Sequence, residues 1–105
     1  MDNVYTARYN SIVANGIEFD WDSMNTKHLA AHKVTPREFE SVMRNSPLDL
    51  AYQVVDGEDR YRSVGMTDSG RSLVAVWTLR DGRVRAVTAF PANAKYKKLF
   101  LARKR

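Results

Sequence analysis

The sequence predicts one α+β domain over residues 1–105, a compact antiparallel β-meander of four to five strands packed by two N-terminal helices and a C-terminal helix. Two helix-start signals lie between residues 22 and 38. Alternation of apolar and polar residues then begins at Leu48, and three Asp-containing turn signals divide the rest of the chain. With 105 residues and 44% hydrophobic content, the chain supports one core. Residues 1–15 are the least defined part.

The first elements are a short strand and a helix. Asn15-Gly16 is a turn signal. The alternating apolar residues that follow it predict a short strand: Ile17, Phe19 and Trp21. Asp22 can cap a helix that runs to His32, because its carboxylate can accept hydrogen bonds from the free amides of the first turn.

The second helix has the stronger signals. Thr35-Pro36-Arg37-Glu38 forms a capping box with proline at the first helical position. Val34 and Phe39 fit a hydrophobic staple around this start. The apolar stripe consists of Phe39, Val42 and Met43, and Asn45 with Pro47 ends the helix.

The meander follows from period-two alternation and turn chemistry. Its turns are Asp56-Gly57, Asp68-Ser69-Gly70 and Asp81-Gly82, and the strands lie near 48–55, 60–67, 72–79 and 83–90. Pro91 ends the last strand. Residues 93–103 then predict a helix with one side formed by Tyr96, Leu99, Phe100 and Arg103.

A two-residue turn at Asp81-Gly82 fixes the register of the last hairpin. It pairs Arg80 with Arg83, Thr78 with Arg85 and Val76 with Val87. Arg80, Arg83 and Arg85 then share one end of one face. The opposite face forms the expected core layer: Leu73, Ala75, Trp77, Leu79, Val84, Ala86 and Phe90.

Charge is unevenly distributed along the chain. Residues 1–59 hold five Lys or Arg and ten Asp or Glu, a net charge of −5, whereas residues 60–105 hold twelve and two, a net charge of +10. A basic half attracts polyanions, because each neutralised phosphate releases condensed counterions. Nucleic acid is therefore the natural partner, and charges spread over a solvated face are the alternative.

Composition excludes several classes of protein. Cysteine is absent, which excludes disulfides, thiolate catalysis and cysteine-based zinc sites and favours a reducing compartment. No apolar run is long enough for a membrane span, and the N-terminus lacks a signal-peptide pattern. We expect a cytoplasmic protein without a membrane partner.

Three blocks, in this order, carry a resemblance to a known family. They are WDSMNTKHLAAHKVTPREFESV, EDRYRSVGMTDSGRSLVAVWTL and RVRAVTAFPANAKYKKLF. Together they resemble the BrnT-like toxins, which are RelE-type ribonuclease toxins of type II toxin–antitoxin systems. The resemblance implies a sheet packed by helices, metal-independent cleavage of RNA without a cofactor, and an antitoxin of the ribbon-helix-helix DNA-binding type. It leaves open a homodimer or a toxin–antitoxin heterotetramer.

Three positions depart from the family pattern. Phe90 stands where the family usually has arginine, and Tyr96 stands where it usually has glutamate. Lys33 replaces the common glycine after the histidine that ends the first helix. These departures motivate a second hypothesis, in which the protein is a non-catalytic relative that binds nucleic acid or an antitoxin.

Metal-free cleavage of RNA needs an acid and base for the proton transfers and cations for the phosphorane. His32 is the acid or base candidate, both by resemblance and because its reference pKa is close to neutrality. Tyr61 and Tyr96 are candidates to assist it or to stack on a base. The predicted catalytic residues are His32, Arg60, Arg71, Arg85, Lys95 and Tyr96, and the predicted RNA-binding residues are Arg80, Arg83, Lys97, Lys98 and Tyr61.

Structural and metal-binding alternatives stay open for some of these residues. His32 can instead serve as a helix-terminal residue that bonds the last carbonyls. Arg60 and Arg62 can lie over Trp77 as packing arginines. His28 and His32, four residues apart, would allow a metal-dependent hydrolase, but no third ligand stands out and we expect no metal.

Overall fold

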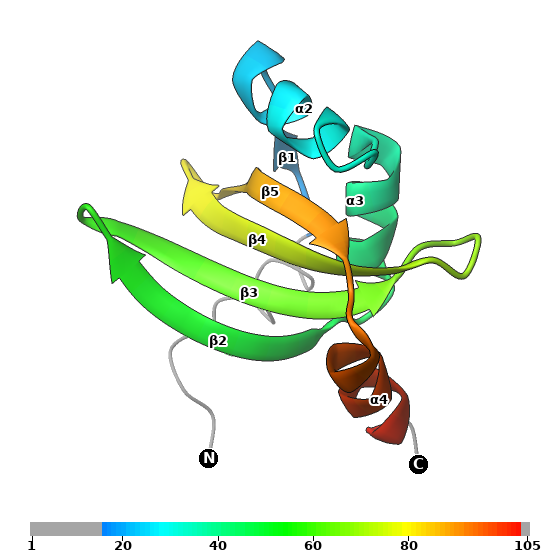
Figure 1. Ribbon diagram of the computed structural model, residues 1–105. Helices are drawn as coiled ribbons and strands as arrows, with labels where there is room; N and C mark the ends of the chain where they lie inside the picture. Colours follow the sequence, from blue (N-terminus) through cyan, green and yellow to red (C-terminus); the bar gives the residue numbers. More distant parts are fainter. Residues whose placement is uncertain (1–15, 104–105) are drawn as a thin grey trace.

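The structure is a computed structural model that describes residues 16–103 (Figure 1). Its elements, in order, are β1 (Phe19–Asp20), α2 (Ser23–Ala30), α3 (Pro36–Arg44), β2 (Leu48–Val55), β3 (Glu58–Met66), β4 (Ser72–Arg80), β5 (Arg83–Pro91) and α4 (Ala94–Ala102). The predicted α+β class, the four-stranded meander and the three helices are confirmed. Within these residues, no helix has both the length and the apolar character needed to cross a membrane.

The five strands form one mixed sheet in the order β1-β5-β4-β3-β2 (Figure 1). The meander is antiparallel, but β1 pairs with β5 in parallel, which the antiparallel prediction did not include. Two helices and three strands separate β1 from β5, and so long a connection permits parallel pairing. The strand predicted from Ile17 to Trp21 is reduced to two residues.

Helix α2 begins as predicted but ends two residues earlier. The carboxylate of Asp22 accepts hydrogen bonds from the amides of Met24 and Asn25, and the Asn25 side chain accepts one from the amide of Asp22. After Ala30 the chain closes in a Schellman motif, with Lys33 N–H donating to the carbonyl of Ala30 and Val34 N–H to that of Leu29. Lys33 has a φ of 58° there, the left-handed conformation that favours glycine. His32 is therefore a turn residue rather than a helical one.

Helix α3 confirms the capping box and the apolar stripe. The hydroxyl of Thr35 accepts from the amide of Glu38, and the Glu38 carboxylate accepts from the amide of Thr35. Phe39, Val42 and Met43 are all buried. They face the sheet where Gly65 lets the helix come close, because a Cβ at Gly65 would lie 3.1 Å from Val42 Cγ1.

The first face of the sheet carries the main core, under α2 and α3 (Figure 1). At its centre the rings of Tyr61 and Trp77 stack with centroids 4.5 Å apart, and both residues are fully buried. Tyr61 pairs with Trp77, so Arg62 lies opposite Val76 and the predicted packing of Arg62 over Trp77 is wrong. The buried cluster consists of Leu29, Val34, Phe39, Val42, Met43, Tyr61, Leu73, Ala75, Trp77, Val84, Ala86 and Ala89.

A bulge in β5 corrects part of the predicted register. Arg80 pairs with Arg83 and Thr78 with Arg85 as predicted, but Val76 pairs with Thr88 while Trp77 pairs with Ala86. Val87 is thus an extra residue, and every residue after it changes face. Ala89 therefore takes the core position predicted for Phe90, and Phe90 lies on the second face.

Helix α4 covers one end of this second face (Figure 1). Phe100 is buried there beside Val64 and Val74, with Tyr96 and Phe90 packed against them. The guanidinium of Arg103 lies 4.7 Å from the centre of the Phe100 ring. Leu99, predicted to share this side of the helix, is instead 45% exposed.

Candidate functional site

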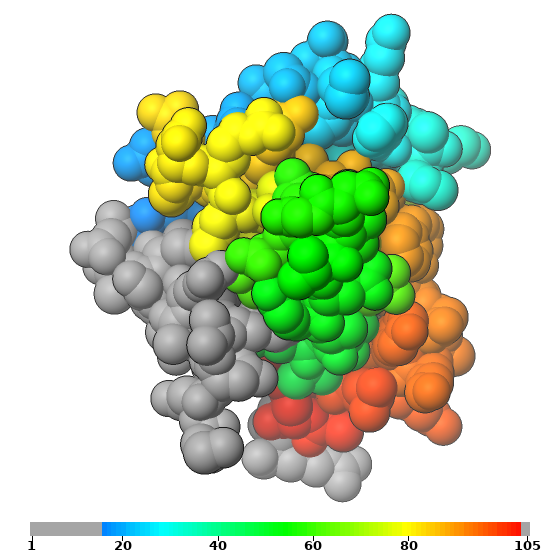
Figure 2. Space-filling model, turned by 90° about the vertical axis from the view of Figure 1, so that its left-hand side faces the viewer, coloured from blue at the N-terminus to red at the C-terminus, as the bar shows by residue number. Residues whose placement is uncertain are grey.

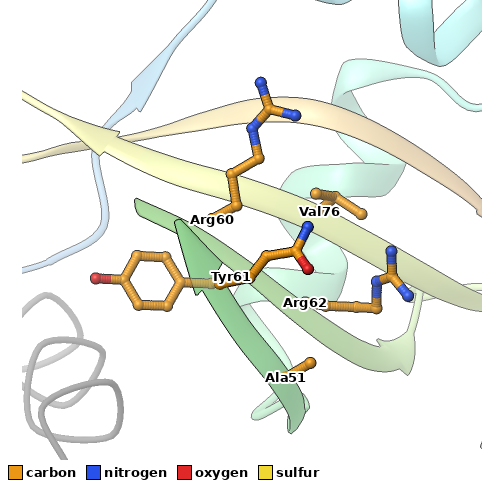
Figure 3. Close-up of a pocket in the computed structure, with 6 residues that line it drawn as sticks. Ala51, Arg60, Tyr61, Arg62 and Val76 are labelled. Carbon is orange, nitrogen blue, oxygen red and sulfur yellow. The ribbon is translucent and has the colours of Figure 1, made fainter. Parts of the chain in front are cut away.

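Basic side chains gather on the end of the second face that α4 does not cover. Alternation along the strands puts Arg60 and Arg62 of β3 on this face, next to Thr78 of β4, because Tyr61 and Trp77 point to the first face. Figure 3 shows Arg60 and Arg62 projecting from this face, with Tyr61 directed away from them. Two arginines of the basic second half of the chain thus share this face.

One hollow on this face, of about 170 Å³, brings arginines from three strands together with a histidine from α2. We call it the arginine hollow, and its principal lining residues are His28, Arg60, Thr78, Arg80 and Arg85. Arg60, Arg80 and Arg85 were predicted from the sequence as phosphate-binding or catalytic residues. Three convergent guanidiniums can bind the oxygens of a phosphodiester and stabilise charge that develops on it.

The histidine in the hollow is His28, which the sequence indicated only as a metal ligand. Its Nδ1 lies 3.3 Å from the carbonyl oxygen of Val87, at the β5 bulge. Donation of Nδ1–H to this carbonyl leaves Nε2 as the acceptor of the neutral ring, as a general base requires. His32, the predicted acid or base, is not among the lining residues, and its ring lies 6.0 Å from that of Phe90.

Arg85 is the most deeply placed cation in the hollow. Its side chain is only 10% exposed, with Nη2 2.8 Å from Asp22 Oδ2 and Nη1 3.8 Å from Asp20 Oδ1. Nη1 is buried and makes no hydrogen bond to any residue between 16 and 103. Hydrogen bonding to the backbone of Asn25, together with Arg85, lowers the pKa of Asp22 below its usual value. The two carboxylates therefore fix the orientation of the Arg85 guanidinium at the wall of the hollow.

The other cations beside Arg85 also contact carboxylates. Arg80 Nη1 lies 3.9 Å from Asp20 Oδ2, and Arg83 Nε lies 3.5 Å from Glu18 Oε2, outside the hollow. In Figure 2 the turn between β4 and β5 (yellow) lies against the segment that holds β1 (blue). The acidic first part of the chain thus balances part of the charge of the basic second part.

Arg60 is held differently, by a residue of its own strand. Its Nε bonds Glu58 Oε1 at 3.1 Å, and its side chain is 33% exposed. Because the contact uses only Nε, it fixes where the guanidinium lies. The N–H groups of the two terminal nitrogens are not used by this contact. Arg60 is therefore oriented and still accessible to a ligand.

Arg71, predicted to be catalytic, lies elsewhere and joins two loops. Its Nη1 donates to the carbonyl of Lys33 at 2.7 Å and to both carboxylate oxygens of Glu38, at 3.2 and 3.1 Å. The backbone hydrogen bond of Thr35, and then Arg71, lowers the pKa of Glu38 below its usual value. These contacts tie the turn before β4 to the start of α3, which is a structural role.

The remaining predicted site residues also lie away from the arginine hollow. Lys95, Lys97 and Lys98 are exposed on α4, and Lys95 and Lys98 line a separate shallow hollow on that helix. Tyr96 packs against the second-face cluster. The ring of Tyr61 is fully buried against Trp77, so the prediction that it stacks on a base is wrong. Its strand position directs it into the core.

Among residues 16–103, no three His, Cys, Asp or Glu residues are grouped so that they could hold a metal ion. His28 and His32 both lie along β5, but at different points: His28 at Val87 and His32 at Phe90.

Comparison with known families gives a match over most of the described residues. A comparison with individual curated proteins gives no match. The model of the family described as "Ribonuclease toxin, BrnT, of type II toxin-antitoxin system" matches residues 21–95, which run from the residue before the α2 cap into α4. This segment contains all the principal residues of the arginine hollow, and it is most of the chain. The chain therefore belongs to the BrnT family of ribonuclease toxins of type II toxin–antitoxin systems.

Proposed function

We propose that the protein is a metal-independent endoribonuclease that cleaves RNA in the arginine hollow and thereby inhibits growth in the cytoplasm. The observation that supports this most is the meeting of His28 with three arginines in one open hollow. Such a set supplies a base and the cations that an anionic phosphorane needs. Family membership adds the expectation of a ribonuclease and implies an antitoxin partner.

The proposed reaction is attack of a 2′-hydroxyl on the adjacent phosphorus. Nε2 of neutral His28 accepts the hydroxyl proton while the 2′-oxygen bonds to phosphorus. The bond from phosphorus to the 5′-oxygen breaks, and that oxygen takes a proton from water. The products are a 2′,3′-cyclic phosphate and a 5′-hydroxyl end. Arg60 and Arg85 bind the two non-bridging oxygens, where negative charge grows.

Cleavage of single-stranded RNA in EDTA tests the proposal. We expect the native protein to release fragments with 2′,3′-cyclic phosphate ends, and Arg60→Ala to lower the rate by about 100-fold, as loss of a charge-stabilising donor does. Lys95→Ala, which removes an exposed cation on α4, is the matched control and should keep at least half of the rate. Native activity no higher than that of Arg60→Ala would contradict the proposal.

One observation favours a second candidate, a relative that binds RNA or an antitoxin without cleaving. Phe90 and Tyr96, which stand where the family usually has arginine and glutamate, both pack into the second-face cluster. The side chains that stand in place of this cation and this carboxylate are thus partly buried in apolar packing. This candidate predicts salt-sensitive RNA binding without fragments, and multiple turnover would exclude it.

For the partner, we propose a ribbon-helix-helix antitoxin that forms a heterotetramer with two toxin chains; a homodimer of the toxin alone is the competing assembly. Light scattering after size-exclusion chromatography of the protein co-expressed with such an antitoxin distinguishes the two. A mass equal to two chains of each supports the heterotetramer, whereas a toxin dimer without antitoxin contradicts it.

A further inference from the structure

We infer that a second hollow beside the arginine hollow is a nucleobase pocket, in which Gln53 reads one base of the RNA and prefers adenine. This inference rests on the proposed function, because the base belongs to the RNA strand whose phosphate the arginines bind. It goes further in naming a specificity-determining residue, on β2, a strand that contributes nothing to the arginine hollow.

The second hollow lies on the same open face and is lined by Ala51, Gln53, Arg60, Tyr61, Arg62 and Val76 (Figure 3). Arg60 lines both hollows and so stands between them. A base and the phosphate of the same strand are neighbours, so a strand with its phosphate on Arg60 and Arg85 would bring a base to this second hollow. The shared arginine is the geometric link between the two.

The lining of the second hollow suits a flat base. Val76, on the central strand β4, is only 9% exposed, and Ala51 at the edge is small, so the hollow has apolar surface. Register sets Gln53 opposite Arg60 and Ala51 opposite Arg62 across the β2–β3 pair. The two guanidiniums thus flank the space, and guanidinium planes stack on bases much as aromatic rings do.

Gln53 supplies the group that can distinguish bases. Its side chain is exposed, and no hydrogen bond to it is found from any residue between 16 and 103. A carboxamide offers one acceptor and a pair of donors side by side, which matches the adjacent donor and acceptor on an edge of adenine. Guanine presents two acceptors on its major-groove edge, a pattern that suits a free guanidinium instead.

Binding of short 2′-O-methyl RNA tests the pocket, because this RNA cannot be cleaved through its 2′-oxygen. Fluorescence anisotropy gives the affinities of the native protein for ten-nucleotide oligomers of A, C and U. A bidentate contact predicts roughly tenfold tighter binding of the A oligomer. Gln53→Leu, of similar size, should remove this preference and leave binding of the C oligomer within about twofold of native, since the phosphate contacts remain.

Val54→Ala is the matched control. Val54 is the next residue of the same strand, is 59% exposed and points to the opposite face. This variant should keep the preference for the A oligomer unchanged. A Gln53→Leu protein that keeps the native order of affinities would overturn the base pocket and leave the proposed function intact. Native protein that binds none of the oligomers would overturn both.

A polyglutamate chain serves as a polyanion without bases. If Gln53→Leu weakened binding of polyglutamate as much as binding of the A oligomer, the hollow would be a site for acidic protein segments, and the inference would fail. We expect polyglutamate to bind native protein and Gln53→Leu equally.

Discussion

Arg85 and Asp22 form an ion pair, with Arg85 Nη2 2.8 Å from Asp22 Oδ2, between the first part of β5 and the residue that caps α2. The same carboxyl group accepts hydrogen bonds from the first amides of the helix through its Oδ1. One side chain therefore both starts the helix that carries His28 and orients the deepest arginine of the hollow. Asp22 therefore positions both His28, the proposed general base, and Arg85, a cation of the proposed site.

Replacing Asp22 by asparagine separates these two roles. Asparagine caps a helix as well as aspartate does, so Asp22→Asn should keep the cap and lose only the stability that the ion pair with Arg85 contributes. The charge that orients Arg85 is lost, and we expect kcat for RNA cleavage to fall about tenfold while KM does not rise, since a negative charge near the phosphate is removed. Steady-state kinetics with a fluorogenic RNA measures both.

Asp22→Ala is the comparison, because it removes the cap as well as the charge. Its melting temperature should fall below that of Asp22→Asn. A rise in KM with unchanged kcat in Asp22→Asn would show that Asp22 does not position Arg85 for the chemical step.

The pKa of Glu38, lowered in the folded protein, predicts a pH dependence of stability. A carboxyl group with a folded-state pKa below its usual value of 4.5 stabilises the protein fully above that pH, and the contribution is lost as pH falls through the lowered pKa. The free energy of unfolding in urea should therefore drop between pH 6 and pH 3. Glu38→Gln, which cannot ionise, should show a smaller drop, and an equal drop in both proteins would contradict the assignment.

Mutation of Arg71 should lower stability and spare RNA cleavage, whereas mutation of Arg60 should spare stability and lower RNA cleavage. Arg71→Ala loses its contacts to Lys33 and Glu38, and we expect about 1 kcal/mol less stability, with cleavage by the folded protein kept within twofold of native. Arg60→Ala should keep its stability within about 0.5 kcal/mol, because its pair with Glu58 is partly exposed, and lose activity. Urea unfolding and RNA cleavage, measured on both variants, check this. If the Arg71→Ala protein is folded but has lost its activity, Arg71 takes part in RNA cleavage and its role is not only structural.

The family arginine can be reintroduced at position 90. Phe90 packs in the second-face cluster, beside Tyr96 and near the ring of His32. Phe90→Arg should lose about 2 kcal/mol of stability, because an apolar side chain leaves the cluster. It should not raise the rate of cleavage more than twofold, since the cations of the hollow already bind the phosphate. A tenfold faster enzyme would show instead that the site extends to β5 beyond the bulge.

Local signals in the sequence predicted most of the fold. The capping residues Asp22 and Thr35 mark the helix starts, and Asp-Gly turns at 56–57 and 81–82 fix the hairpins, because caps and turns depend on a few neighbouring residues. The parallel pairing of β1 and the bulge at Val87 depend on contacts between distant segments. No short pattern around these positions indicates them.

The site was predicted less completely than the fold, for the same reason. Arg80 and Arg85 follow from hairpin register, which is local. The choice between His28 and His32 depends on where α2 ends and on the carbonyl of Val87, which the bulge places. Gln53, on β2, carried no charge or motif that could single it out in the sequence.

The rate of RNA cleavage by His28→Ala, measured beside that of His32→Ala in EDTA, tests the central claim most directly. Loss of a general base lowers the rate by roughly 100-fold or more, and we predict this for His28→Ala. His32→Ala, outside the arginine hollow, should stay within about threefold of the native rate. A large loss in His32→Ala together with near-native cleavage by His28→Ala would contradict the placement of the site.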